Sequence, residues 1–152
     1  MNQFTQDLSI GQLAERAFVT TMANYSTKLT DFEYNTSADL EGLKKYDVKF
    51  KVNGKEATAE VKHDLKASQT GNLAIEYMNH KGDKTGILAT ESYFYVFLVG
   101  EVFYIFKTVE LKKLAFNSTK KWKYVTSSSG NAELILIPLS EAKKYAHFTI
   151  NK

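Results

Sequence analysis

The sequence contains no cysteine among its 152 residues, which excludes disulfide bonds and thiolate metal sites. Long apolar stretches are missing as well, because the longest uncharged apolar run, Tyr93 to Val99, has seven residues and a membrane-spanning helix needs roughly 20. No basic segment followed by an apolar segment stands near the N-terminus, so the sequence shows no export signal. We therefore expect a cytoplasmic protein that does not bind a membrane.

Charge of one sign is not in large excess. Twenty Lys and Arg against seventeen Asp and Glu give a net charge of +3, which is too small to indicate nucleic-acid binding by itself. The chain is 43% hydrophobic and 24% charged, an ordinary globular composition. A fold of this length buries about 70% of the surface that its unfolded chain exposes. We expect one domain over residues 1–152.

The first half of the sequence predicts a helix and then strands. Apolar residues recur at helical spacing from about Ser9 to Tyr25, and Ser9 with Gln12 matches a capping box. The segment from Ser26 to Lys45 is polar and weakly patterned, which predicts a loop or a short irregular segment. Two alternating segments follow, separated by Asn53-Gly54, the strongest short hairpin signal: Tyr46 to Val52 and Glu56 to Lys62.

The second half predicts further strands and short helices. A third strand over Asn72 to Tyr77 is expected to neighbour the first two. A turn is expected at His80 to Thr85 and helical turns at Gly86 to Ser92. Tyr93 to Val99 and Val102 to Lys107 are expected to form a buried hairpin with a type II′ turn at Gly100, followed by a helix capped by Thr108. Strands are then expected at Trp122 to Thr126 and Ala132 to Leu139, before a terminal helix capped by Ser140. This order predicts an α/β fold with a mixed central sheet flanked by helices.

Acidic residues two positions before a lysine occur five times, beginning at Asp47, Glu60, Asp64, Glu110 and Glu141, against about two expected by chance. Glu110 and Glu141 lie in predicted helices, where positions i and i+2 point to different sides. A strand instead projects both residues from one face. Glu60 and Lys62 are therefore expected to share a face.

Asp47 lies on the polar face of the preceding strand, and the hairpin places it roughly opposite Glu60, within two residues of register. Two carboxylates on adjacent strands suit Mg²⁺, which takes one or two carboxylates and keeps water or phosphate oxygens as its other ligands. The alternative is a solvated sheet face on which Lys49, Lys51 and Lys62 balance the two acids. The polar loop after the strand, which runs from Asp64 to Glu76, favours the first interpretation because its donors suit a phosphate backbone.

Several of these motifs together resemble the PD-(D/E)XK nuclease superfamily. They are Asp47, the interval to Glu60-Val61-Lys62, a preceding helix that carries Glu15, and the segments Thr70 to Glu76 and Thr85 to Thr90. Tyr46 stands where the family name has proline. Small phage and bacterial nucleases and four-way-junction resolvases belong to this superfamily.

The resemblance implies a restriction-endonuclease-like core and a DNA endonuclease that uses Mg²⁺ or Mn²⁺. Asp47, Glu60 and the Val61 carbonyl would bind the metal, and Lys62 would stand beside the attacking water as base or positioner. Glu15 would be a further acid of the site or a solvated flank of its helix, and Glu76 a nearby acid or an exposed partner of a lysine. DNA-contacting residues are expected at Lys49, Lys66, Thr70, Asn72 and Thr85.

Other interpretations stay open beside the nuclease. An interaction module would keep the fold without catalysis, and a structural protein would use the acids only as surface charges. The three histidines lack metal-ligand spacing, and His63 is expected to be structural. The aromatic run from Tyr93 to Phe106 is assigned to the core, with a homodimer interface as an additional role. Lysines around Trp122, from Lys112 to Lys123, are interpreted as a solvated surface or a phosphate contact.

Overall fold

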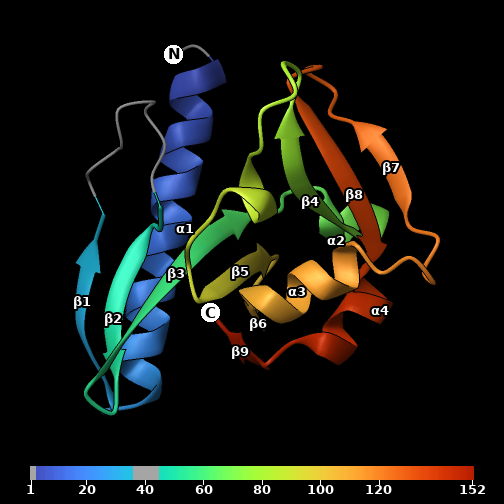
Figure 1. Ribbon diagram of the computed structural model, residues 1–152. Coiled ribbons are helices and arrows are strands. Elements are labelled where there is room, and N and C mark those ends of the chain that lie inside the picture. The colour runs from blue at the N-terminus through green and yellow to red at the C-terminus, as the bar shows by residue number, and fades with distance from the viewer. Residues whose placement is uncertain (1–2, 36–44) are drawn as a thin grey trace.

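The computed structural model describes residues 3–35 and 45–152, and its strands form two sheets (Figure 1). Six strands form one sheet in the order β1-β2-β3-β5-β6-β9, and three form the other in the order β4-β8-β7. Only β3 and β5 pair in parallel among the described strands. The expected α/β fold with a mixed central sheet and flanking helices is confirmed.

The elements have the following bounds: α1 Gln3–Tyr25, β1 Leu29–Tyr34, β2 Val48–Val52, β3 Lys55–His63, α2 Ala67–Thr70, β4 Asn72–Asn79, η1 Gly86–Leu88, β5 Phe94–Val99, β6 Val102–Lys107, α3 Thr108–Ala115, β7 Lys123–Thr126, β8 Ala132–Pro138, α4 Leu139–Ala142, η2 Lys143–Tyr145 and β9 Phe148–Asn151. Within the described part of the chain, no helix is both long enough and apolar enough to cross a membrane.

Helix α1 covers one face of the six-stranded sheet. Ala14, Phe18 and Met22 recur every four residues, so they form one stripe, and all three are buried. The Phe18 ring packs edge-on against Phe50 and Phe103 of the sheet. The helix begins at Gln3, so Ser9 lies inside it and the predicted capping box is wrong.

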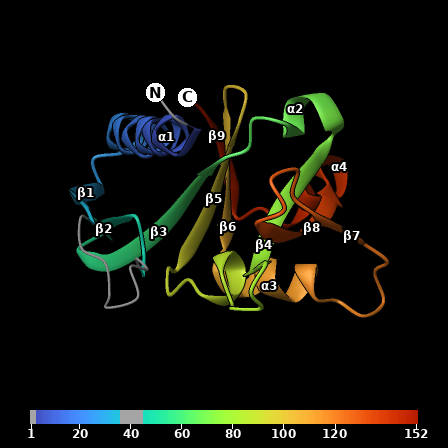
Figure 2. The same cartoon turned by 90° about the horizontal axis from the view of Figure 1, so that it is seen from above.

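The opposite face of the same sheet packs against the three-stranded sheet and α3. Figure 2 shows α1 on one side of β5 and β6, with β4, β8 and β7 on the other. Strand β5 is buried on both faces because its residues alternate between the two cores: Val96 and Leu98 face α1, and Tyr95, Phe97 and Val99 face the small sheet. Burial on both faces accounts for its continuous apolar run.

The β2–β3 hairpin is confirmed with the predicted turn. Val52 pairs with Lys55, and the two turn residues have positive φ, 52° at Asn53 and 81° at Gly54, as a type I′ turn requires. The register then places Val48 opposite Ala59. The β5–β6 hairpin is also confirmed, with φ of 59° at Gly100.

Two expectations about the sheet are wrong. Strand β1 lies inside the segment predicted as a loop or a short irregular segment. Its register with β2 shifts between Thr30 and Glu33, and Asp31 has a φ of 55°. That irregularity breaks the alternation by which a strand is recognised. Residues 36–44 of the predicted loop lie outside the described residues. Strand β4 does not neighbour β3 but pairs with β8 in the second sheet. The expectation was wrong because an alternating pattern identifies a strand but does not specify its partner.

The C-terminal third has the predicted β7–β8 pair but different caps and one more strand. The Thr108 hydroxyl is buried and has no hydrogen-bond partner in the described part of the chain, so it does not cap α3. Ser140 lies inside α4, which begins at Leu139 and has only four residues. Strand β9, which the sequence analysis does not predict, completes the large sheet beside β6.

Candidate active site

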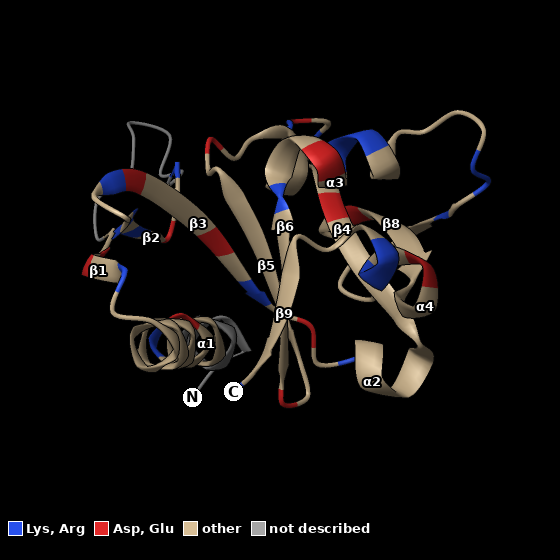
Figure 3. Cartoon of the chain, turned by 90° about the horizontal axis from the view of Figure 1, so that it is seen from below, with Lys and Arg blue, Asp and Glu red and all other residues tan. Residues whose placement is uncertain are grey.

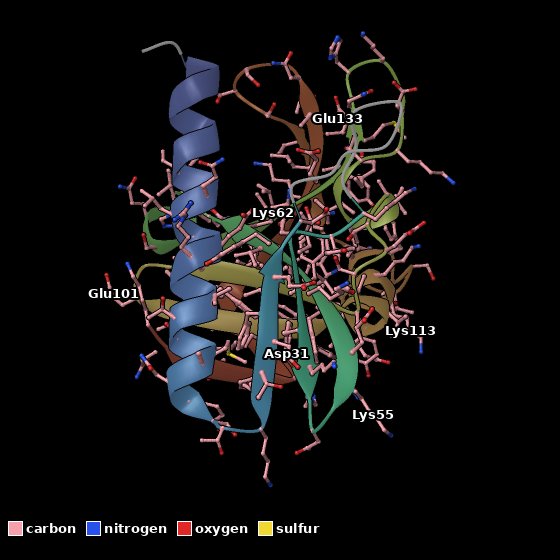
Figure 4. All side chains as sticks on the ribbon, turned by 90° about the vertical axis from the view of Figure 1, so that its left-hand side faces the viewer. Asp31, Lys55, Lys62, Glu101, Lys113 and Glu133 are labelled. Atoms are coloured by element: carbon pink, nitrogen blue, oxygen red, sulfur yellow. The ribbon has the colours of Figure 1, made fainter. Side chains whose placement is uncertain are left out.

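A cavity of about 390 Å³ opens between α1 and the end of β3. Strand β3 contributes four consecutive residues and α1 contributes the other wall, beside which Lys62 lies in Figure 4. The lining residues are Ile10, Gly11, Gln12, Glu15, Asp47, Glu60, Val61, Lys62, His63 and Leu65. The structure thus brings Asp47, Glu60, Val61, Lys62 and Glu15 together.

Asp47 stands directly before β2 and is 8% exposed. Its N–H donates to the Ala59 carbonyl (3.0 Å), and its Oδ2 accepts from the Val61 N–H (2.8 Å). Asp47 therefore spans the part of β3 that carries Glu60, within the predicted register. The Val61 N–H, which has no strand partner because β2 begins only at Val48, is satisfied by this carboxylate.

The Val61 carbonyl points to the same edge of β3. In an antiparallel ladder, the N–H and the C=O of one residue face the same neighbouring strand. Because the Val61 N–H meets Asp47, the Val61 carbonyl is directed toward the Asp47 side as well. Asp47 and Val61 thus offer oxygen ligands at the place where β2 begins.

Glu60 and Lys62 share the face of β3 opposite Ala59 and Val61, and both line the cavity at the end of that strand. The Lys62 Nζ lies 3.2 Å from the Glu60 Oε1, and the side chains are 42% and 14% exposed respectively. Burial lowers the pKa of Lys62, but acidic groups outweigh this effect and raise the pKa above its ordinary value. These groups are Tyr95, Glu60, Asp47 and Glu76.

Tyr95 and Glu76 act on this lysine from two other strands. Tyr95 is buried and stands opposite Glu60 in the parallel β3–β5 register, and burial raises the pKa of its hydroxyl. Glu76 approaches from β4 in the second sheet. The sequence analysis assigned Tyr95 to the core. Its only signal for a polar role was a hydroxyl within an aromatic run.

Glu15 and His63 form parts of the wall. Glu15 lines the cavity from α1 and is half-buried. His63 lines the cavity too, although the sequence analysis expected a purely structural histidine. Burial, together with Lys152, lowers the pKa of His63.

The residues expected to contact DNA do not line the cavity. Lys49 pairs with Glu33 (3.4 Å), and the exposed Lys66 donates to the Ser128 hydroxyl (3.4 Å). Thr70 accepts a hydrogen bond from the Asn72 N–H in a local turn. The Thr85 hydroxyl is buried and has no hydrogen-bond partner among the described residues.

The remaining acid-x-lysine pairs have other roles. The Asp64 carboxylate accepts three backbone N–H groups, from Lys66 (3.2 Å), Ala67 (3.0 Å) and Ala74 (3.0 Å). It ties the end of β3 to β4. Glu110 and Glu141 pair with the lysine three residues onward rather than two, as expected on helices.

The donor set of the cavity is chemically suited to a hard cation. Within the described residues, no three His, Asp or Glu side chains form a complete metal-binding group. Two carboxylates and one carbonyl are nevertheless what Mg²⁺ uses when water and phosphate oxygens supply the rest of its shell.

Comparison with known proteins finds a similar solved structure. A scan against protein-family models and a search of curated proteins give no match. The solved structure of the bacterial homing endonuclease I-Ssp6803I aligns over 90% of this chain and 77% of that chain, with 21% identity and a TM-score of 0.47.

Proposed function

We propose that this chain is a DNA endonuclease of the PD-(D/E)XK type that hydrolyses phosphodiester bonds with Mg²⁺ or Mn²⁺. The observation that carries this proposal is the convergence of Asp47 and Glu60, from the two strands of one hairpin, with Lys62 in an open cavity. A solvated sheet face, the simplest alternative, would not need the Asp47 carboxylate buried against the Val61 N–H.

The residues divide the work of hydrolysis. Asp47, Glu60 and the Val61 carbonyl would hold the cation, which when bound offsets phosphate charge and lowers the pKa of a coordinated water. Lys62 is held as an ammonium by Glu60 at the cavity and would orient the attacking water; it would deprotonate that water only where a bound cation offsets the acidic groups that raise its pKa. Glu15 would add a further carboxylate from the opposite wall.

Purified protein incubated with supercoiled plasmid tests the proposal. Nicking or linearisation is expected in Mg²⁺ or Mn²⁺ and not in EDTA, with weak activity in Ca²⁺, whose larger and less demanding shell activates water less well. Cleavage that persists in EDTA would remove the mechanism. DNA binding without cleavage in any metal would instead support an interaction module.

A substrate panel refines the class of nuclease. Linear duplex, single-stranded DNA and a four-way junction are compared with plasmid under the same conditions. Cleavage confined to the junction would support a resolvase acting as a homodimer, because a resolvase must cut two strands at related positions. Equal cleavage of plasmid and linear duplex would oppose that refinement and leave the endonuclease proposal intact.

A further inference from the structure

The positive charge of the chain is concentrated in one segment far from the cavity. Residues 107–124 contain six of the twenty basic residues and one of the seventeen acidic residues, so this segment carries +5 and the remainder −2. Figure 3 shows basic residues along α3 and the loop that follows it, and Figure 4 shows Lys113 away from α1. The total charge of the chain does not reveal this asymmetry. A polyanion that approaches this segment would nevertheless encounter a strongly positive local surface.

The lysines of this segment are largely uncompensated. Lys113 pairs with Glu110 at 3.6 Å. Lys112, Lys121 and Lys123 are exposed, and no ion pair joins them to any residue in the described ranges. A solvated surface usually mixes both signs of charge, whereas this surface does not.

Exposed aromatic rings lie among these lysines. Phe116 is 39% exposed and Tyr124 is 57% exposed, and both rings pack edge-on against Tyr77 at 6.1 and 5.9 Å. Trp122 is fixed by donating its Nε1–H to the Leu114 carbonyl (2.8 Å), and Lys120 Nζ lies 5.8 Å from its ring centroid. The rings are therefore held in place rather than free to rotate.

We propose that this lysine–aromatic surface binds single-stranded nucleic acid, with phosphates on the lysines and unpaired bases on the exposed rings. The surface comprises Lys112, Phe116, Lys120, Lys121, Trp122 and Tyr124. Sequence-tolerant binding of single strands combines a basic track with aromatic rings on which bases stack. A paired duplex would use the lysines but leave the ring faces unused. Binding here goes beyond the proposed hydrolysis and requires neither the cavity nor a cation.

Binding is measured by fluorescence anisotropy with a labelled 20-nucleotide oligothymidine and a labelled 20-base-pair duplex, both in EDTA. The single strand is expected to bind at least fivefold more tightly than the duplex. The double variant Lys120→Ala/Lys121→Ala should weaken strand binding about tenfold. It should also reduce the slope of log K against log salt by about 1.4, because each lysine that neutralises a phosphate of a single strand contributes about 0.7. Tyr124→Leu should weaken binding at least fivefold, and Tyr124→Phe should retain it.

Matched controls carry the same chemical changes elsewhere. Lys55→Ala/Lys143→Ala removes two exposed lysines, and Tyr25→Leu removes a ring that is 62% exposed on α1. Both should leave strand binding within twofold. Far-ultraviolet circular dichroism and Trp122 fluorescence verify that each variant is folded.

Three outcomes would overturn the proposal. If the control lysine variant loses as much strand affinity as Lys120→Ala/Lys121→Ala, the binding reflects only general charge. Equal affinity for the duplex would remove the single-strand preference. Polyglutamate that displaces the labelled strand as well as unlabelled strand does would indicate an acidic protein partner. The nuclease proposal is tested separately by plasmid cleavage. If it fails, no cleavage is seen, while strand binding in EDTA can still be measured. A lysine or Tyr124 variant that loses strand binding but still cleaves plasmid would show that this surface is independent of the cavity.

Discussion

Asp47, Glu60 and Lys62 are tested by one substitution each. We expect Lys62→Ala to retain metal and DNA binding but to lose cleavage by at least a hundredfold, because it removes the group beside the water. Asp47→Asn and Glu60→Ala should lose metal affinity and cleavage together. Unfolding free energies should change by about 1 kcal/mol or less, since Lys62 is partly exposed and Asn keeps an acceptor for the Val61 N–H. Plasmid cleavage, metal titration and urea unfolding measure these effects.

The matched controls are Glu110→Ala and Glu141→Ala. They break the same acid-x-lysine pattern on α3 and α4, where each acid pairs with a lysine on the helix surface. Cleavage should stay within a few-fold of wild type. A larger loss in these variants than in Glu60→Ala would contradict the assignment of the site.

Asp64 shares the sequence pattern but is expected to act on stability. Its carboxylate accepts three backbone N–H groups, which Asp64→Ala would leave without a partner. We expect a loss of about 2 kcal/mol in the free energy of unfolding. Glu101→Ala, at an exposed turn position, should change it by less than about 0.5 kcal/mol, and urea denaturation compares the two. Equal effects would refute the structural role of Asp64.

Local pattern sufficed for some residues of the site and not for others. Asp47, Glu60 and Lys62 were predictable because a type I′ turn fixes the register of one hairpin. Tyr95 was not, because its approach to Lys62 depends on the parallel β3–β5 pairing, and Glu76 was expected as a nearby acid but on a strand neighbouring β3 rather than in a second sheet. The positions of Tyr95 and Glu76 depend on contacts between segments that are distant in sequence. The alternation of polar and apolar residues does not predict such contacts.

At the scale of the element, α1 determines whether the cavity has a second wall. Phe18→Ala removes the buried ring that packs against Phe50 and Phe103, and we expect a loss of about 3 to 5 kcal/mol. Leu13→Ala, on the same helix at 66% exposure, should cost less than about 0.5 kcal/mol. Guanidinium unfolding followed by circular dichroism tests the pair. Similar costs would show that α1 is not anchored through Phe18.

Elements with clean periodicity were predictable, and irregular ones were not. Helix α1 and the two hairpins follow from spacing and turn residues. Strand β1 is interrupted at Asp31, and β9 has only four residues beside an already recognised hairpin. Short or irregular edge strands are fixed mainly by their neighbours, so their own sequence says little.

At the scale of the whole molecule, β5 joins the two halves of the structure. It supplies Val96 and Leu98 to the core under α1, and Tyr95 and Phe97 to the core shared with the small sheet. The same strand therefore connects the wall of the cavity to the sheet that carries Glu76. We expect the chain to unfold as one cooperative unit, which the single domain predicted from sequence length would also require.

Two core variants test that cooperativity. Ile135→Ala acts in the small sheet and Phe50→Ala in the core under α1; both residues are buried. Each should lower the free energy of unfolding by about 2 to 5 kcal/mol. Trp122, the only tryptophan, packs against the core shared with the small sheet, whereas circular dichroism reports every element. If the chain unfolds as one unit, both variants shift the fluorescence and dichroism midpoints together. A fluorescence transition that Phe50→Ala leaves unmoved would show instead that the small sheet unfolds on its own.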